Sequence, residues 1–281
     1  MKNIPVQKIT ELIQDLCIQA CHDLNPDIIQ AFKNAGAREE SPIGAAILDQ
    51  LLKNAEIATD KQIPICQDTG FTVIFMEIGQ EVHFYGGSLK DAINEGVRRG
   101  YRDGYLRKSI IDNPLTHPVN SRDNTPAVIH TEIVPGDSVK ITVLPKGGGS
   151  ENAGRIKMLT PAEGVEGVKQ FVLETVRETG ADACPPLLIG VGFGGTFDYV
   201  GFLAKKALLR PIGQRNPDPD LAKLEIEWLE EVNKLGIGPG GLGGRVTALD
   251  LFLEVFPRHI ATFPVAINIQ CHAARSKSAT L

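Results

Sequence analysis

Residues 63–70, which read IPICQDTG, are the stretch around which the rest of the chain can be organised. Pro64 disfavours a helical conformation at the residue before it and lacks a backbone N–H donor. Gly70 permits a tight turn ahead of the apolar run 71–78. These features predict that Cys66 lies on a loop just before a strand, next to an acid–amide pair that can meet a ligand.

The composition is that of an ordinary globular protein, with 281 residues of which 42% are hydrophobic and 22% are charged. A formal net charge of −5 argues against nucleic acid or an anionic membrane as the main partner. No apolar run approaches the roughly 20 residues that span a bilayer. The N-terminus is polar and amphipathic rather than a signal peptide, so we expect a cytoplasmic protein.

The hydrophobic pattern predicts a mixed α/β fold in which sheet regions are flanked by helices. Helical spacing over residues 5–60 indicates a helical N-terminal region, and TPAE at 160–163 carries the signals of another helix start. The helix that starts at TPAE is expected to end at residue 180. Further helices are expected to begin at residue 88 and to span residues 196–209 and 219–235. Strands are expected at 71–78, 127–133, 138–144, 187–191, 247–255 and 264–269. We expect one domain over residues 1–281 that includes the helical region at residues 1–60, with a strand order that the pattern does not determine.

Two features of the sequence could bind an anion. The helix that begins at Ser88 is expected to hold Arg98, Arg99, Arg102 and Arg107, either as a solvated face or in part as a clamp for a small dianion. Residues 146–150, which read KGGGS, follow a predicted strand, so their backbone N–H groups could converge on an anion. The alternative for this second feature is a flexible loop.

Gly190, Gly192 and Gly195 match the G-x-G-x-x-G pattern at a strand–helix junction. A dinucleotide-binding unit also needs a second strand after the helix and an acid about 20 residues further on. Here the helix leads instead into a loop that reads QRNPDPD. We therefore expect these glycines to permit close packing rather than to bind a dinucleotide.

Cys17 and Cys21 lie four residues apart and would share one face of a predicted helix. Such a pair can bind a metal ion, but no His or Cys partner follows at the spacing of a zinc finger. We therefore interpret both as buried core residues.

The other three cysteines, Cys66, Cys184 and Cys271, occupy similar settings at junctions between a regular element and a loop. An odd number of scattered cysteines in a long chain favours thiols or metal ligands over disulfides. A closed iron–sulfur site has four cysteine ligands, so three thiolates would leave one coordination position open. A catalytic metal needs such an open position to bind its substrate. The spacing alone leaves two interpretations open, ligands of one cluster or unrelated thiols.

Five segments resemble class I, iron–sulfur fumarases, specifically the α subunit of the two-subunit form. They are IPICQDTG (63–70), SRDNTPAVIH (121–130), KGGGSEN (146–152), ADACPPLLIGVG (181–192) and INIQCHAARS (267–276). The α subunit of L-tartrate dehydratase, a close relative, is similar too. The resemblance runs from about residue 40 to the end and implies that Cys66, Cys184 and Cys271 bind a [4Fe–4S] cluster whose fourth iron binds the substrate.

The same resemblance implies roles for several polar residues. Gln67 and Asp68 would contact the substrate, Arg107 would bind one of its carboxylates, and the loop around Gly148 would offer backbone donors to a carboxylate. His259 would pair with the aspartate and donate a proton to the departing hydroxide. The implied substrate is a small dicarboxylate, and the implied reaction is the reversible hydration of fumarate to L-malate with the cluster as a Lewis acid.

The resemblance also implies a partner. Single-chain relatives continue into a second domain that supplies the catalytic base, whereas this sequence ends at Leu281. We therefore expect a separate β subunit, an α2β2 assembly and little activity of the chain alone, with a fragment of a longer protein as the alternative. The alternative activity is that of the α subunit of L-tartrate dehydratase, which converts tartrate to oxaloacetate.

Three other classes of protein are less consistent with the sequence. An electron-transfer iron–sulfur protein would need a fourth cysteine in a similar setting. A dinucleotide-dependent enzyme rests on the glycine match alone. A purely structural subunit requires that the three loop cysteines have no ligand.

Overall fold

The computed structural model describes residues 2–281 and has the predicted mixed α/β fold. The chain forms two compact units, each built from separate stretches of sequence. Unit 1 contains residues 2–25, 54–148 and 275–281, and unit 2 contains residues 26–53 and 149–274. The chain therefore passes from one unit to the other several times, and the expectation of one domain over residues 1–281 stays a prediction.

Unit 1 is built on a four-stranded sheet in the order β12–β7–β2–β6. Its strands are β2 (Phe71–Gly79), β6 (Val128–Val134), β7 (Val139–Lys146) and β12 (Lys277–Thr280). β2 pairs in parallel with β6 and antiparallel with β7, and β7 pairs antiparallel with β12. The strand predicted after the Cys66 loop is thus a central strand of this sheet.

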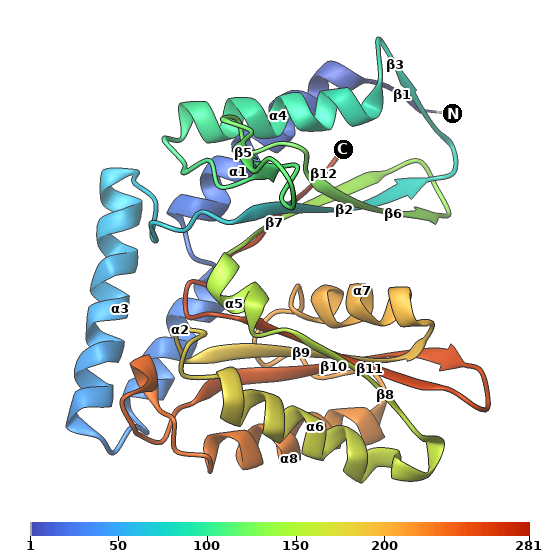
Figure 1. The fold of residues 1–281 in the computed structure, drawn as a ribbon. Coiled ribbons are helices and arrows are strands. Elements are labelled where there is room, and N and C mark those ends of the chain that lie inside the picture. The colour runs from blue at the N-terminus through green and yellow to red at the C-terminus, as the bar shows by residue number, and fades with distance from the viewer. Residues whose placement is uncertain (1) are drawn as a thin grey trace. The chain divides into compact units, whose positions relative to one another are not determined.

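Two helices, α1 (Val6–His22) and α4 (Leu89–Asp103), pack against each other over one face of the unit 1 sheet (Figure 1). α4 begins as the sequence predicts, because the hydroxyl of Ser88 accepts a hydrogen bond from the Asp91 N–H at 3.2 Å. The prediction that this helix also holds Arg107 is wrong. The helix ends at Asp103, and Tyr105 takes a left-handed conformation with φ of 53° that turns the chain away.

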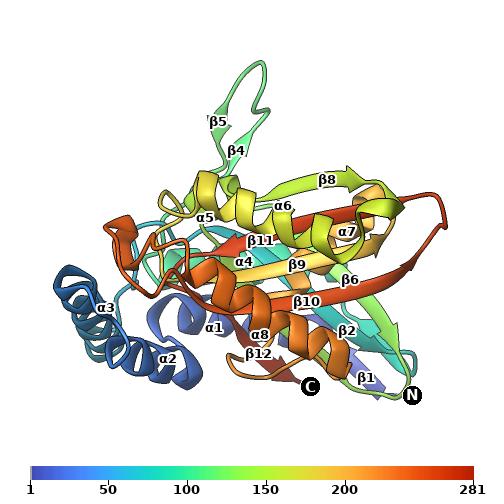
Figure 2. The same ribbon diagram turned by 90° about the horizontal axis from the view of Figure 1, so that it is seen from below.

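Unit 1 also contains two short ribbons that were not predicted from the sequence. β1 (Lys2–Pro5) pairs in parallel with β3 (Val82–Tyr85). β4 (Ile111–Asp112) and β5 (Val119–Asn120) form a hairpin that extends away from the main sheet of this unit (Figure 2).

Unit 2 is built on a second four-stranded sheet, in the order β10–β9–β11–β8. Its strands are β8 (Arg155–Leu159), β9 (Leu187–Gly195), β10 (Ala248–Arg258) and β11 (Phe263–Gln270). β9 and β10 are parallel, and β11 runs antiparallel to its neighbours β9 and β8. The start of β9, the start of β10 and the end of β11 therefore lie at one end of the sheet.

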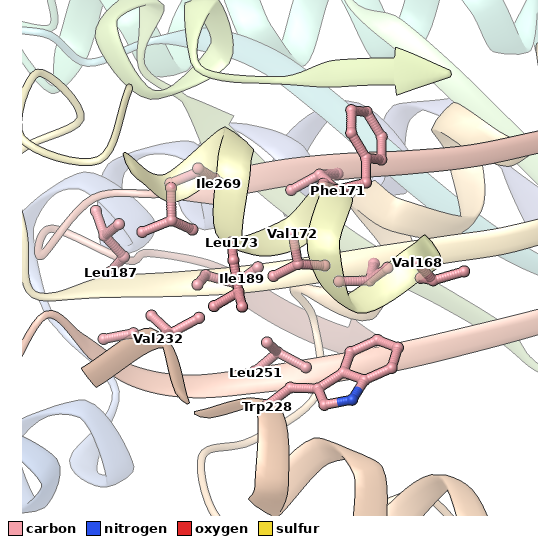
Figure 3. Close-up of a cluster of buried hydrophobic side chains, with 14 of the residues drawn as sticks. Val168, Phe171, Val172, Leu173, Leu187, Ile189, Trp228, Val232, Leu251 and Ile269 are labelled. Atoms are coloured by element: carbon pink, nitrogen blue, oxygen red, sulfur yellow. The ribbon is translucent and has the colours of Figure 1, made fainter. Parts of the chain in front are cut away.

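Helices cover both faces of the unit 2 sheet (Figure 1). α6 (Gly164–Thr179) and α8 (Pro219–Asn233) enclose the larger core, in which Val172 and Trp228 pack against Ile189 and Leu251 (Figure 3). α7 (Phe197–Ala207) lies on the opposite face.

The glycines of β9 allow α7 to pack closely on the sheet, as expected from the sequence. A β-carbon on Gly190 would lie 2.1 Å from the Ala204 carbonyl oxygen, and one on Gly192 would lie 2.6 Å from the Ala204 nitrogen. Both contacts are with backbone, which cannot move aside easily. These positions therefore serve helix–strand packing.

The remaining elements of the chain are shorter or connect the two units. α2 (Pro26–Gly36) belongs to unit 2, whereas α3 (Pro42–Lys61) and α5 (Gly148–Asn152) each contain residues of both units. Short 3-10 turns lie at Pro161–Glu163 and Pro239–Gly241. Over residues 2–281, every helix is too short or too polar to cross a membrane.

Candidate active site

The Cys66 loop of unit 1 is fixed on its N-terminal side by two hydrogen bonds to Ile65. The Ile65 N–H donates to the Cys21 carbonyl oxygen at 2.9 Å, and the Asn54 side chain donates to the Ile65 carbonyl oxygen at 2.8 Å. Ile65 itself is buried. The residue just before the cysteine is therefore held between α1 and α3.

On its C-terminal side the loop is held through three consecutive carbonyl groups, those of residues 68–70. Arg275 Nη2 donates to the first, and the Tyr101 hydroxyl donates to the second at 2.7 Å and to the third at 3.0 Å. The Asn124 side chain also donates to the third, at 3.1 Å. All three donor residues are at most 2% exposed. Buried side chains thus satisfy a loop backbone that no strand could pair.

The Asp68 carboxylate is oriented by two backbone donors. The Gly70 N–H reaches Oδ1 at 3.0 Å, and the Gly148 N–H reaches Oδ2 at 2.7 Å. Gly70 has φ of +80°, and a β-carbon there would lie 2.7 Å from the Lys146 backbone. Only glycine satisfies both constraints, so the turn predicted at Gly70 is also the point where the loop contacts the end of β7.

The Cys66 thiol is partly exposed and lies among polar groups. Its Sγ accepts the Asp68 N–H at 3.4 Å and lies 3.5 Å from Gln67 Oε1. Arg107 is exposed, and its carbonyl oxygen accepts the Thr69 hydroxyl at 3.0 Å. The predicted residues of unit 1 are therefore grouped around one loop.

The cysteines of unit 2 lie at one end of its sheet. Cys184 precedes β9, and Cys271 directly follows β11, whose last residue pairs with Leu188 in β9. The N–H of His272, the residue after Cys271, donates to the Cys184 carbonyl oxygen at 3.1 Å. This bond joins the two cysteine loops directly.

Cys184 is exposed and has φ of 57°, a left-handed conformation that is costly for a residue other than glycine. The glycine-rich loop 236–244 contacts the chain on both sides of Cys184. The Gly240 N–H donates to the Pro185 carbonyl oxygen at 2.9 Å, and a β-carbon on Gly241 would lie 3.1 Å from Ala181. A strained cysteine maintained by its surroundings is typical of a functional position.

His259 lies at the opposite end of the unit 2 sheet. It follows β10 and precedes β11, whose eight residues span about 25 Å at roughly 3.3 Å per residue. The imidazole is exposed, and its Nδ1 accepts the Ala261 N–H at 3.2 Å. It lines an open pocket of about 480 Å³ with Tyr199 and Phe256. Within unit 2, His259 is therefore remote from both cysteines.

Cys17 and Cys21 are buried side chains of α1, as expected from the sequence. Burial raises the pKa of Cys17 well above its usual range and, more than any other effect, raises the pKa of Cys21 to about 11. The Arg275 guanidinium lowers the pKa of Cys21, whereas Cys66 and Asp68 raise it. Both buried thiols stay protonated near neutral pH.

The loop thiols have the donor chemistry that an iron–sulfur cluster requires. All five cysteines lie within residues 2–281 and none forms a disulfide, and the three on loops are the accessible ones. Within the same residues no three side chains of His, Cys, Asp or Glu form a group that could hold one metal ion. A cubane differs from a single ion because each thiolate binds a different iron. Soft thiolate donors suit such irons, and each of the three loop cysteines can offer one thiolate.

The residues that hold the Cys66 loop were not predicted from the sequence. Asn124 and Arg275 lie inside segments that carry the family resemblance, which is a signal that could have selected them. Tyr101 carries no such signal, because one tyrosine on an amphipathic helix is indistinguishable from a core residue. Asn54 is likewise one polar residue among many on its helix.

Comparison with known proteins agrees with the resemblance noted in the sequence. The sequence profile of the family described as Fumarate hydratase (Fumerase) matches residues 10–280. A Methanocaldococcus jannaschii protein, provisionally named L(+)-tartrate dehydratase subunit alpha, is 41% identical over 273 residues, which cover 95% of each chain. The L(+)-tartrate dehydratase subunit alpha of Escherichia coli K12 is 34% identical over 278 residues, which cover 98% of this chain and 91% of that protein.

The chain belongs to the fumarate hydratase (Fumerase) family. Membership of this family supports an enzyme of the hydro-lyase class. Both relatives are named as alpha subunits.

Proposed function

We propose that the chain is the cluster-bearing α subunit of a fumarate hydratase. In this proposal Cys66, Cys184 and Cys271 hold a [4Fe–4S] cluster, and a separate β subunit completes the site. The enzyme interconverts fumarate and L-malate. When bound, the cluster supplies a Lewis-acidic iron that can accept the hydroxyl and one carboxylate oxygen of malate.

One observation carries the proposal, the fixed carboxylate of Asp68 two residues after the accessible Cys66. Two backbone N–H groups orient this carboxylate, and buried side chains hold the carbonyls of its loop. A group that exchanges a proton with substrate must be held within hydrogen-bond reach of the reacting atom. The preorganised loop supports such a role next to a metal ligand.

The dehydration of malate removes a hydroxide from C2 and a proton from C3. Hydroxide is a poor leaving group, so proton delivery to the departing oxygen lowers the barrier. We propose that Asp68 holds that proton. Gln67 lies at the exposed edge of the same loop, where we propose that it contacts the substrate. The base that removes the C3 proton belongs to the β subunit in this proposal.

Arg107 and Gly148 are the proposed carboxylate-binding groups. Arg107 is exposed and its backbone carbonyl bonds the loop at Thr69, so we propose that its guanidinium pairs with a substrate carboxylate. The Gly148 N–H is donated to Asp68 at 2.7 Å. A substrate carboxylate that takes this N–H therefore displaces Asp68 Oδ2, which couples substrate binding to the position of the proposed acid.

The position of His259 places a condition on its proposed role as the partner of Asp68. His259 lies a strand length from Cys184 and Cys271 within its own unit. We therefore propose that His259 serves the site of a second α chain in an α2β2 assembly. A mixture of Cys66→Ala and His259→Asn chains tests this directly. If two copies share the site, about a quarter of the sites in an equal mixture contain both Cys66 and His259, and activity returns in proportion. Absence of any recovered activity would contradict the shared site.

The decisive test of the proposed function is turnover by the reconstituted pair. The α chain is loaded with iron and sulfide under strictly anaerobic conditions, mixed with the β subunit, and assayed with L-malate and with L-tartrate. Interconversion of malate and fumarate by the pair, and little by α alone, supports the proposal. A loaded pair that acts on neither substrate contradicts it.

Asp68→Asn provides a sharper form of the same test. We expect this change to lower kcat by about a hundredfold or more while the iron content is unchanged, because it removes the proton-holding group. Asp91→Asn is the matched control, since Asp91 is an exposed acid of unit 1 in the first turn of α4. Equal kcat values for the two variants would contradict the role of Asp68.

The second candidate is the α subunit of an L-tartrate dehydratase. The names of the relatives at 41% and 34% identity favour it. It would use the same cluster and differ in the pocket for the extra hydroxyl of tartrate. Faster turnover of tartrate than of malate by the reconstituted pair would select this candidate.

A further inference from the structure

Arg275 is a buried cationic side chain that lies beside the Asp68 loop. It is 2% exposed, which is rare for an arginine outside a specific pairing. Its Nη2 donates to the Asp68 carbonyl oxygen. The residue begins the last segment of unit 1, four positions after Cys271 in the sequence.

Asp68 is held from two directions. Arg275 fixes its main chain at the carbonyl, while the N–H groups of Gly70 and Gly148 fix its side chain. A β-carbon on Gly147 would lie 3.2 Å from Asp68 Oδ2 and 3.8 Å from Arg275 Nη2. The two side chains and the glycine backbone therefore pack together, so a shift of the guanidinium would shift the carboxylate.

The positive charge of Arg275 also affects two buried groups next to this loop, Cys21 and Tyr101. It lowers the pKa of Cys21 and that of Tyr101, although burial raises both pKa values by more. The Tyr101 hydroxyl is itself bonded to the carbonyls of Thr69 and Gly70. A buried positive charge is thus located where the proposed site gathers thiolate and carboxylate charge.

We propose that Arg275 is a positioning residue of the active site, which sets the orientation of the Asp68 carboxylate through its bond to the Asp68 carbonyl. The inference rests on the proposed function only for its catalytic consequence. Its structural part concerns hydrogen bonds within unit 1 and can be tested without a cluster.

The test uses hydrogen exchange of the Gly70 and Gly148 amides in the full-length chain purified without a cluster. Both amides donate to the Asp68 carboxylate. In Arg275→Gln we expect these two amides to exchange about tenfold to a hundredfold faster, as loss of a hydrogen bond from a charged group implies. Amides of the unit 2 core should keep their wild-type exchange rates.

Arg258→Gln is the matched control, because the Arg258 guanidinium also donates to backbone carbonyls, those of residues 259, 260 and 262. It should leave the exchange of Gly70 and Gly148 unchanged. Unchanged exchange at both glycines in Arg275→Gln would overturn the proposal, as would a uniform increase across the chain. If Arg275→Gln does not fold, Arg275→Lys gives the same comparison with the charge retained.

A second readout separates this inference from the proposed function. In the loaded pair with the β subunit, Arg275→Gln should lower kcat about tenfold without loss of iron. If the wild-type chain binds no cluster, the proposed function fails, while the exchange result still decides the position of Arg275. Unchanged kcat with faster exchange at the two glycines would overturn the catalytic role alone.

Discussion

The Cys66 loop of unit 1 and the Cys184 and Cys271 loops of unit 2 are held in place by different means. In unit 1, buried side chains from distant regions of the sequence bond the carbonyls of residues 68–70. In unit 2, backbone groups bond each other, from His272 to Cys184 and from Gly240 to Pro185. Single side-chain changes should therefore disturb the first loop, whereas glycine substitutions should disturb the others.

A second contrast separates the loop cysteines from those of α1. The loop cysteines are partly or fully exposed, whereas Cys17 and Cys21 are buried in the core. Exposure on a loop permits a thiolate to bind a metal, and burial in an apolar core disfavours the thiolate. The two contrasts lead to four predictions, from the largest expected effect to the smallest.

The largest effect should come from alanine substitution of the loop cysteines. Cys66→Ala, Cys184→Ala and Cys271→Ala should each abolish the intact cluster, because each removes a proposed ligand. Cys17→Ala and Cys21→Ala are the matched controls and should retain it. Iron and acid-labile sulfide per chain measure the outcome, and full iron retention in any of the first three would contradict the ligand assignment.

The second prediction concerns the glycine-rich support of Cys184. Gly238 has φ of +70°, and a β-carbon there would lie 2.2 Å from the Gly243 backbone. We expect Gly238→Ala to lower the free energy of unfolding by about 2–5 kcal/mol, from the left-handed conformation and the clash together. Urea denaturation measures this change.

Gly236→Ala is the control for this prediction. Gly236 has a similar φ of +68°, but open space surrounds the position of its β-carbon. It should therefore cost only the conformational contribution, about 1–2 kcal/mol. Equal losses for the two variants would show that the close approach of Gly238 to Gly243 has no energetic role.

The third prediction concerns alkaline pH. Burial raises the pKa of Cys21 to about 11, above its value in the unfolded chain. Between about pH 9 and pH 11 the folded state therefore binds more protons than the unfolded state, so stability falls as pH rises. The loss should reach about 2 kcal/mol by pH 11, and stability below about pH 8 should not depend on this group.

Cys21→Ala isolates that contribution. The variant should show a shallower fall in the free energy of unfolding between pH 9 and pH 11, as measured by urea denaturation at each pH. Cys184→Ala is the control, because the Cys184 thiol is exposed and belongs to unit 2. A fall as steep in Cys21→Ala as in the wild type would contradict the role of this thiol.

The smallest effect should come from Tyr101→Phe. The change removes the hydroxyl that donates to the carbonyls of Thr69 and Gly70 but keeps the buried ring. We expect a loss of about 1–2 kcal/mol in the free energy of unfolding and faster exchange near the Cys66 loop. Tyr105→Phe is the control, because Tyr105 is 89% exposed. Identical stability of the two variants would show that the Cys66 loop does not depend on this buried donor.

Much of the fold was predictable because its longer elements carry local signals. The helices that begin at Pro26 and Pro42 start with a proline, and Ser88 caps the helix that begins at Leu89. β2, β7, β9 and β11 lie on apolar stretches of the sequence. Elements such as β4 and β5, with two residues each, are too short to show a period. β12 is a four-residue strand that exists because it pairs with β7.

The candidate site was predictable in its local features and not in its long-range contacts. The loop at Cys66 and the turn at Gly70 follow from adjacent residues. The bond from Arg275 to Asp68 joins residues 207 positions apart, and no local pattern encodes it. The position of His259 likewise depends on the end of the sheet at which the connection from β10 to β11 lies, which the spacing of residues does not determine.

The most direct test of the central proposal is the iron and acid-labile sulfide content of the wild-type chain after strictly anaerobic reconstitution. A [4Fe–4S] cluster held by three cysteines predicts about four of each per chain, with a loss of iron on exposure to air. Absence of both iron and sulfide, under conditions that load other iron–sulfur proteins, would contradict the assignment of Cys66, Cys184 and Cys271 as cluster ligands.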